Sequence, residues 1–522
     1  AWAQGFASAG LVRADDVAAG RIDRYGTYDD QQGGASARAF VIGGVGREDH
    51  DHAWGADVFA QLRRFDYRQN YTGALLDDRR PGESPHDQRG DLLEQGYRDA
   101  MLGARAEAST KFERDPIHGK WIAGAFARMD VASADSRRLR SLDGAPYRTE
   151  LDADITQVNA AGYLATEAHA FGDRLTLDAG LRAEAVMYAV DDFCAHRDQW
   201  FPGAETDDVN CADQDRYGSV LRSARRLAFG TGFGPRATAL FQLANWKDKG
   251  SLSLAAGAGR GMRSLEATSL SQDEKAPLGK ITSYELGTIL RRSGLWGWLQ
   301  ARAVGYYTTV DNDLVFDEGS GKNVFAGETS RYGALVAATV EAGALAANVS
   351  ATYTYATFGD GIPPTYQYFN SDRVPGKLVP YVPPLVTRLD ATYRWSPFGP
   401  GLVIRHGLGA AYVAPRPLPQ SERSDAVFTI DASSSARWNG IELGLSLENA
   451  LDSRYNLAEY NYSSWYPQVS GTAFPTRVPT RQVSPGPPRQ ISLTLTLYFD
   501  ELLPHPHHAG EATKSPDPKA VP

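Results

Sequence analysis

Two groups of aromatic residues lie in segments that are otherwise polar and rich in turn-forming residues. They are Tyr366, Tyr368 and Phe369 in one segment, and Tyr460, Tyr462, Trp465 and Tyr466 in another. Aromatic faces with amides nearby suit a small organic ligand such as a siderophore, a corrinoid or a sugar. We therefore predict these side chains as ligand-binding residues. The alternative is that the rings pack loop against loop and contact no ligand.

The sequence contains no arrangement of residues that predicts catalysis. The stretch Glu48–His52 holds carboxylates and histidines, but a solvated polar turn is the better interpretation. Asp207, Asp208, Asn210 and Asp213 offer oxygen ligands of the kind that Ca²⁺ prefers, although they lack EF-hand spacing. We predict a protein that is not an enzyme, with no catalytic residue, no metal site and no cofactor.

The chain has two cysteines, Cys194 and Cys211, and both lie in the same predicted loop. Two cysteines that share one loop of so long a chain favour a disulfide that closes this loop in an oxidising compartment. The alternative is a pair of unrelated thiols.

Most of the chain consists of segments in which apolar and polar residues alternate. Successive side chains of a strand point to opposite faces, so each segment predicts a strand with one apolar and one polar face. Segment 489–499 places Ile491, Leu493, Leu495, Leu497 and Phe499 on one face and Ser492, Thr494, Thr496 and Tyr498 on the other. Charged residues on the polar faces of other segments are Asp178, Arg182, Glu184, Glu442 and Glu448.

The connections between these segments alternate between short turns and long polar loops. A soluble β-sandwich has no reason to sort its loops in this way, whereas an outer-membrane barrel has short turns on one side of the bilayer and long loops on the other. Tryptophans at strand ends support the barrel, because such rings form a girdle at the bilayer interface. Those flanking predicted short turns are Trp54, Trp121, Trp246, Trp296, Trp298, Trp395 and Trp438.

We therefore predict an all-β fold, a transmembrane antiparallel up-and-down β-barrel with about 18 strands across residues 1–499. Residues 500–522 are rich in Pro, His and charge and predict a disordered periplasmic tail. The net charge of −9 argues against a nucleic-acid partner. The strands are expected at 1–7, 36–45, 54–68, 95–110, 118–131, 155–170, 174–190, 230–244, 250–261, 281–292, 297–311, 331–343, 345–358, 385–396, 402–414, 426–437, 440–450 and 489–499.

Several motifs resemble those of TonB-dependent outer-membrane receptors. The stretch Leu447–Tyr455, followed by a long loop and by Pro488–Phe499, resembles the last two strands of that family. Other similar stretches are Gly257–Ser264 with Ser283–Gly287, Gly180–Arg182, and Gly20–Asp29 with Gly33 and Gly34. The resemblance spans nearly the whole chain and implies a barrel of about 22 strands.

The N-terminal part departs from the pattern of that family. We find neither its TonB-contacting segment nor its plug domain, and about four of the family's barrel strands have no counterpart. We interpret the chain as a fragment of a longer reading frame. The alternatives are a second chain that supplies the missing strands and a smaller closed barrel.

The resemblance implies an outer-membrane receptor of a Gram-negative bacterium that takes up a scarce ligand, such as a ferric siderophore, with energy delivered through TonB. Its expected partners are outer-membrane lipid, a small-molecule ligand and, if a plug lies upstream, the TonB complex. One alternative is a passive or ligand-selective porin of about 18 strands. Another is a secreted β-rich binding module.

Overall fold

The computed structural model describes residues 1–75, 90–139, 144, 146–193, 224–264, 278–295, 297–317, 322–360, 374–399, 401–467, 469 and 478–499. Several predictions fall outside these described residues. They concern Cys194, Cys211, Tyr366, Tyr368, Phe369, Asp207, Asp208, Asn210, Asp213, Trp296 and the tail 500–522.

An antiparallel sheet of 18 strands dominates the described part of the chain, and each of its strands corresponds to one predicted segment. The alternating pattern therefore located the strands correctly. They are β1 (Trp2–Ala7), β3 (Gly33–Glu48), β4 (His52–Asn70), β5 (Leu92–Arg114), β6 (Ile117–Leu139), β7 (Pro146–Ala170), β8 (Leu175–Asp192), β9 (Ala224–Asn245), β10 (Gly250–Ser264), β11 (Leu278–Gly294), β12 (Gly297–Asp317), β13 (Lys322–Ala342), β14 (Leu345–Phe358), β15 (Leu385–Trp395), β16 (Leu402–Val413), β17 (Val427–Trp438), β18 (Ile441–Glu448) and β21 (Gln490–Leu497).

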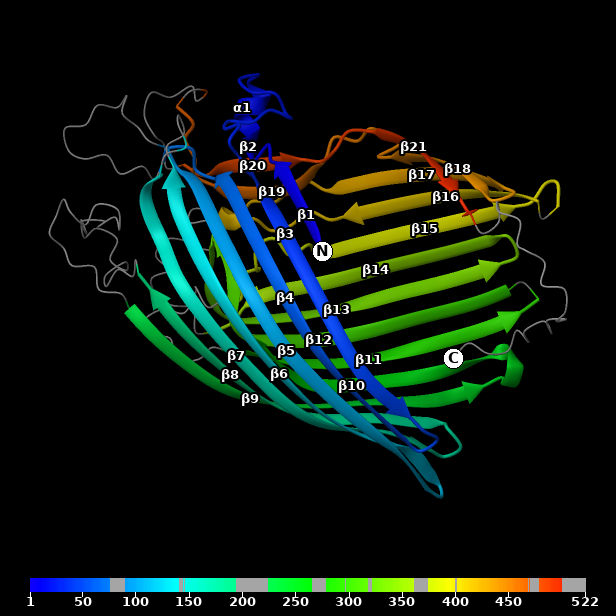
Figure 1. Cartoon of the computed structure of the whole chain (residues 1–522). Helices are drawn as coiled ribbons and strands as arrows, with labels where there is room; N and C mark the ends of the chain where they lie inside the picture. Colours follow the sequence, from blue (N-terminus) through cyan, green and yellow to red (C-terminus); the bar gives the residue numbers. More distant parts are fainter. Residues whose placement is uncertain are drawn as a thin grey trace.

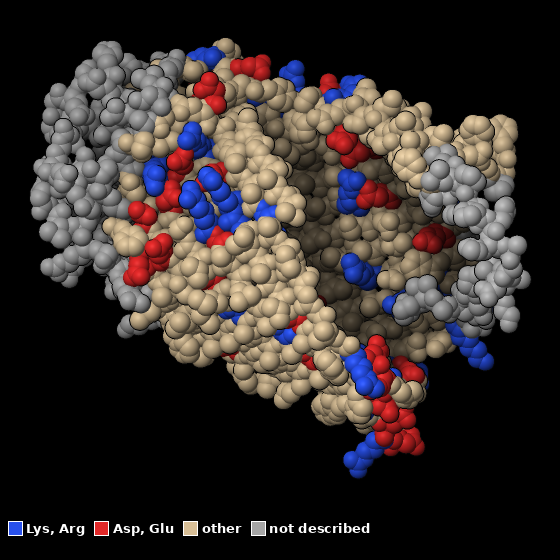
Figure 2. All heavy atoms as spheres, viewed as in Figure 1, with Lys and Arg blue, Asp and Glu red and all other residues tan. Residues whose placement is uncertain are grey.

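The strands pair in an up-and-down order, which confirms the predicted topology. β1 pairs with β3, each strand from β3 to β17 pairs with the next one in the sequence, and β18 pairs with β21. Figure 1 shows the sheet curling round a central space, with β3–β8 in blue to cyan on one wall and β10–β17 in green to yellow on the other. Figure 2 shows this hollow, whose far wall carries charged side chains.

The structure corrects the boundaries of several predicted loops. β6 and β7 extend through most of the predicted loop 132–154, and β12 and β13 do the same for 312–330. Beyond the apolar band of a membrane barrel, side chains on the outer face need not be apolar. The alternating pattern consequently fades there, while the backbone pairing continues.

The predicted loops 8–35 and 451–488 contain elements that the pattern did not reveal. A second sheet has the order β19–β20–β2, formed by β19 (Asn456–Tyr462), β20 (Thr480–Pro485) and β2 (Val12–Arg13). A short helix, α1 (Ala14–Ala18), follows β2 directly. Figure 1 places these elements at the end of the barrel where the long connections lie.

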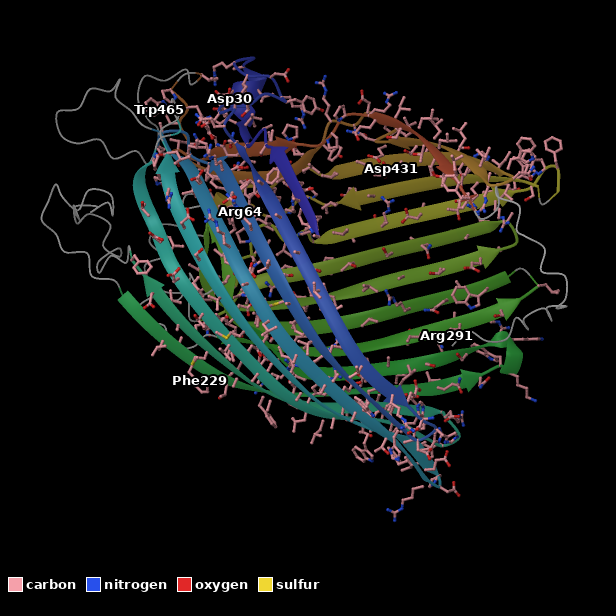
Figure 3. All side chains as sticks on the ribbon, viewed as in Figure 1. Asp30, Arg64, Phe229, Arg291, Asp431 and Trp465 are labelled. Carbon is pink, nitrogen blue, oxygen red and sulfur yellow. The ribbon has the colours of Figure 1, made fainter. Side chains whose placement is uncertain are left out.

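The outer face of the large sheet is apolar and exposed. Val58, Leu102 and Leu164 are 58%, 60% and 65% exposed, and the strand registers place their side chains on this one face. Phe229, labelled in Figure 3, projects from the same outer face of β9. In the part of the chain that the structure describes, no helix is both long and apolar enough to cross a membrane.

Aromatic rings lie at both ends of this apolar band. At the short-turn end, the exposed tryptophans are Trp54, Trp121, Trp246, Trp395 and Trp438, as predicted, whereas Trp298 is half-buried. Toward the loop end, the exposed tyrosines are Tyr284, Tyr307, Tyr332 and Tyr353. Such girdles match the two interfaces of a bilayer.

Candidate functional site at the mouth of the barrel

The long connection between β18 and β21 reaches across to the connection that follows β4. The Trp465 amide donates to the Thr72 carbonyl at 2.9 Å, and the Ala74 amide donates to the Trp465 carbonyl at 2.9 Å. Gly73, which lies between Thr72 and Ala74, has a φ of +79°, and a Cβ atom there would lie 2.1 Å from the Trp465 carbonyl oxygen. Only glycine permits both this backbone conformation and this close approach. The two connections are therefore joined by their backbones.

Three of the predicted ligand-binding residues make packing contacts in this junction. Tyr462, Trp465 and Tyr466 are buried, with exposed fractions of 6%, 5% and 2%. The Tyr462 hydroxyl donates to the Tyr71 carbonyl at 2.8 Å, and the Tyr466 hydroxyl donates to the same carbonyl at 3.1 Å. Their rings hold the last long connection against the connection after β4.

Tyr460 belongs to a different group of rings, which we call the mouth cluster: Tyr71, Phe316, Tyr381 and Tyr460. The Tyr460 ring centroid lies 5.2 Å from that of Tyr381 and 6.0 Å from that of Phe316, which in turn lies 6.0 Å from that of Tyr71. All four residues are half-buried.

The mouth cluster joins parts of the sheet that lie far apart. Tyr71 follows β4, Phe316 belongs to β12, and Tyr381 precedes β15. Because β5 to β11 separate β4 from β12 in the pairing order, these rings come from opposite walls. They meet at Tyr460 of β19, so the cluster bridges the mouth of the hollow.

A polar network, the N-terminal clasp of Asp16, Arg21 and Tyr28, fixes the connection between β1 and β3 to this assembly. The Asp16 side chain is 1% exposed and accepts hydrogen bonds from the Tyr28 hydroxyl at 2.5 Å and from Arg21 Nε at 2.7 Å. The Tyr28 ring stacks on Tyr466 with centroids 3.7 Å apart. Burial raises the pKa of the Tyr28 phenol, and its bond to Asp16 acts in the same direction. Tyr28 therefore stays protonated and remains a donor.

The last long connection is anchored where the motif Leu447–Tyr455 leaves β18. The Asn449 side-chain amide donates to the carbonyls of Ser453 and Pro487, at 3.0 and 3.2 Å. The Arg489 amide donates to Asp452 at 3.0 Å. Asn449 and Asp452 thus join the two ends of the connection that carries β19 and β20. These two residues of the motif therefore have a structural role.

Two polar hollows line the inner wall. One, of about 500 Å³, includes Arg388, Asp390, Asp431, Glu448 and Tyr455; Arg388 binds Asp390 with an Nη2–Oδ1 distance of 2.5 Å. Asp431 is labelled on β17 in Figure 3. The other hollow, of about 710 Å³ on the opposite wall, includes Glu107, Tyr163, Arg182, Glu184 and Arg236. The predicted polar-face residues Arg182, Glu184 and Glu448 thus line the lumen.

Sequence reasoning missed Tyr71, Phe316 and Tyr381, because a lone aromatic at a strand end carries no signal of its own. Among the described residues, no group of three or more His, Cys, Asp or Glu side chains is placed to hold a metal ion. The described site offers aromatic rings and charged hydrogen-bonding groups.

Residues 2–450 match the family model described as TonB dependent receptor-like, beta-barrel. The chain belongs to the TonB-dependent receptor family. This receptor has no match among the curated proteins. Its fold is that of solved receptor structures at low sequence identity.

The unliganded ferric citrate transporter FecA is 13% identical, with a TM-score of 0.65; the match covers 94% of this chain and 65% of FecA. The siderophore receptor PiuA from Acinetobacter baumannii is 13% identical, with a TM-score of 0.65, covering 91% of this chain and 66% of PiuA. The copper transporter OprC is 16% identical, with a TM-score of 0.56, covering 89% of this chain and 68% of OprC. This receptor chain thus spans about two thirds of the length of these structures, and the shared feature is the fold.

Proposed function

We propose that this receptor lies in the outer membrane of a Gram-negative bacterium and takes up a scarce metal chelate, a ferric siderophore or a similar ligand, with energy from the TonB complex. The mouth cluster is the observation that carries the proposal. Its rings come from separate parts of the sheet, and all four residues remain partly exposed. A ligand seated on them would touch several connections at once.

The lumen below the mouth cluster supports a polar ligand. Arg388 and Arg182 offer guanidinium donors on opposite walls, and each has a carboxylate beside it, Asp390 and Glu184. Paired charges of this kind can bind an oxygen-rich chelate by exchanging their mutual contacts for contacts to the ligand. The hollows of about 500 and 710 Å³ fall within the usual size range of small-molecule sites.

A passive porin is the competing function, and the mouth cluster argues against it. A porin needs an open aqueous path. Here, connections from opposite walls meet at Tyr460 with ring contacts of 5.2 and 6.0 Å. A secreted binding module is disfavoured by the exposed apolar outer face of the barrel.

Ligand binding tests the proposed site directly. The protein in detergent micelles is titrated with ferric catecholate, hydroxamate and citrate complexes, and protein fluorescence quenching reports binding. Loss of the Tyr460 ring in Tyr460→Ala should weaken binding of the recognised class by about two- to tenfold, since an aromatic contact contributes about 0.5–1.5 kcal/mol beyond burial. Tyr393→Ala is the matched control, because Tyr393 is an exposed tyrosine on the outer face at the opposite end.

Two outcomes would overturn the proposal. One is the absence of saturable binding for all three classes of complex. The other is a large, steady conductance of the protein in a planar bilayer, which would make it a porin. Energisation is tested separately by uptake of the labelled complex in cells with and without TonB, where the proposal requires uptake only in the former.

A further inference from the structure

Arg64 of β4 and Arg98 of β5 lie directly opposite each other in the strand register, on the outer face of the sheet. Like charges in this arrangement, with Cβ atoms about 5 Å apart, destabilise a sheet unless something neutralises them. Arg64 Nε donates to Asp66 at 2.6 Å, yet the Arg64 side chain stays 60% exposed. Within the described residues, the exposed Arg98 side chain forms no hydrogen bond or ion pair, and Asp135, in the next row of paired residues on the same face, offsets its charge only through a longer-range electrostatic interaction.

The arginine pair stands on the polar rim of a trough of about 860 Å³. The rim consists of residues that are paired directly across neighbouring strands. The opposite side consists of the residues two positions away along each of these strands, toward the short turns. The rim consists of Ala37, Arg64, Arg98, Ser133, Asp154 and Asp191. The opposite side consists of Ala39, Leu62, Ala100, Val131, Thr156 and Ala189.

The trough lies at the upper edge of the apolar band. Ten residue steps separate Trp54 from Arg64 along β4, which is about 34 Å at about 3.4 Å per residue. With a strand tilt of about 40°, the height is about 26 Å, close to the apolar band of about 25 Å in membrane barrels. Arg64 is therefore level with lipid headgroups at the loop end. Figure 3 shows Arg64 on the outer face, and Figure 2 shows basic and acidic side chains gathered together on that wall above a largely uncharged area.

We propose that Arg64 and Arg98 bind the phosphate of a membrane lipid whose acyl chains lie along Leu62, Ala100 and Val131. A phosphate between two guanidinium groups removes their repulsion and accepts charge-assisted hydrogen bonds from both. Arg64 keeps its Nη groups for this purpose, because Asp66 occupies only Nε. The apolar side of the trough continues into the band that faces the acyl chains, so one lipid satisfies both surfaces.

The other end of the rim determines where the phosphate lies. Asp154 is exposed and stands two strands away from Arg98, about 10 Å at the usual strand spacing. Its negative charge repels a phosphate and confines it to the arginine end. Removing that charge should therefore strengthen binding, whereas removing either arginine should weaken it.

Native mass spectrometry of the full chain, with dioleoyl phosphatidic acid added to the detergent micelle, tests the proposal. The wild-type protein should retain phosphatidic acid and should not retain phosphatidylcholine. Arg64→Gln/Arg98→Gln should lower the apparent affinity by about tenfold for each arginine, and Asp154→Asn should raise it. Arg64→Lys/Arg98→Lys should keep most of the binding because it keeps the charge.

Arg291→Gln is the matched control, since Arg291 belongs to the same sheet but lies on the inner face. Folding of each variant is checked by the heat-dependent gel shift of intact barrels. Equal retention of phosphatidic acid by the wild-type protein and the double glutamine variant would overturn the proposal, as would equal retention of phosphatidylcholine. Displacement of the lipid by inorganic phosphate at a similar concentration would also overturn it, because the site would then bind a free anion.

Discussion

Asp16→Asn should loosen the loops over the mouth of the barrel while leaving the barrel strands intact. The Asp16 carboxylate is buried and accepts hydrogen bonds from Tyr28 and Arg21. Asparagine has the same shape but carries no charge, and its amide nitrogen replaces one of the two acceptor oxygens that Tyr28 and Arg21 use. Tyr28 stacks on Tyr466, so loss of the Tyr28–Asp16 bond should also loosen the connection that carries Tyr460 of the mouth cluster.

The magnitude follows from these contacts. A hydrogen bond to a charged group contributes about 1.5–3 kcal/mol, so the two partners together contribute about 3–6 kcal/mol. Arg21 is 36% exposed and regains water when its partner loses its charge, which favours the lower end of this range. A loss of about 3 kcal/mol increases the open population of the clasp about 150-fold.

Hydrogen exchange followed by mass spectrometry measures this opening. The Trp465 and Ala74 amides are bound across the junction between the two connections, and they exchange only when it opens. Both should exchange about 100-fold faster in Asp16→Asn. Amides in the middle of β12 should keep their rate, because the barrel strands do not depend on the clasp.

The matched control is Asp23→Asn, which removes an exposed carboxylate of the same connection whose only described side-chain hydrogen bond is from the Tyr25 amide. It should leave the Trp465 and Ala74 rates unchanged. Unchanged exchange rates of the Trp465 and Ala74 amides in Asp16→Asn would refute the reasoning, because the clasp would then not stabilise the junction between the two connections. Faster exchange throughout β12 would also refute it, because the effect would not be confined to the mouth.

Two further predictions concern the membrane face and the clasp. Val336→Arg, on the outer face of β13 between Tyr332 and the turn after β13, should destabilise the folded barrel in lipid by about 2–4 kcal/mol. Leu335→Arg, on the inner face, should cost far less. Equal losses in urea refolding curves would contradict the assignment of faces. Hydrogen bonds from Arg13 hold the pKa of Asp15 below its usual value of about 3.9. The stability from Asp15 is therefore present above that value and lost as the pH falls through the lowered pKa. Limited pepsin digestion should show the connection after β1 becoming cleavable over this range, and Asp15→Asn should abolish this part of the pH dependence.

The sequence predicted the strands and their faces well, because both depend on local periodicity. Leu443 and Leu445 alternate with Glu442 and Ser446, and β18 presents them to opposite sides as expected. The sorted loops predicted the membrane setting for the same reason, since loop length is read directly along the chain. The extra length of β6 and β7 was missed because their ends rise above the apolar band, where the alternating pattern stops.

The predicted site residues that are neighbours in the chain have different surroundings in the structure. The sequence selected Tyr460, Tyr462, Trp465 and Tyr466 as one group because they are neighbours in the chain. The structure separates them: Tyr462, Trp465 and Tyr466 are buried in the junction, and Tyr460 retains an exposed surface. Such a division depends on which distant segments cover each ring, and residue type carries no information about that.

By itself, the sequence determined the class of fold, the two faces of the sheet and the family. The class of fold and the faces follow from the alternation of apolar and polar residues within each strand. The family follows from short motifs that are read directly along the chain. Only the tertiary structure decided that Tyr71, Phe316, Tyr381 and Tyr460 meet across the mouth, and that Arg64 lies opposite Arg98. The first fact depends on the curling of the sheet and the second on strand register, and both are set by contacts between residues far apart in the chain.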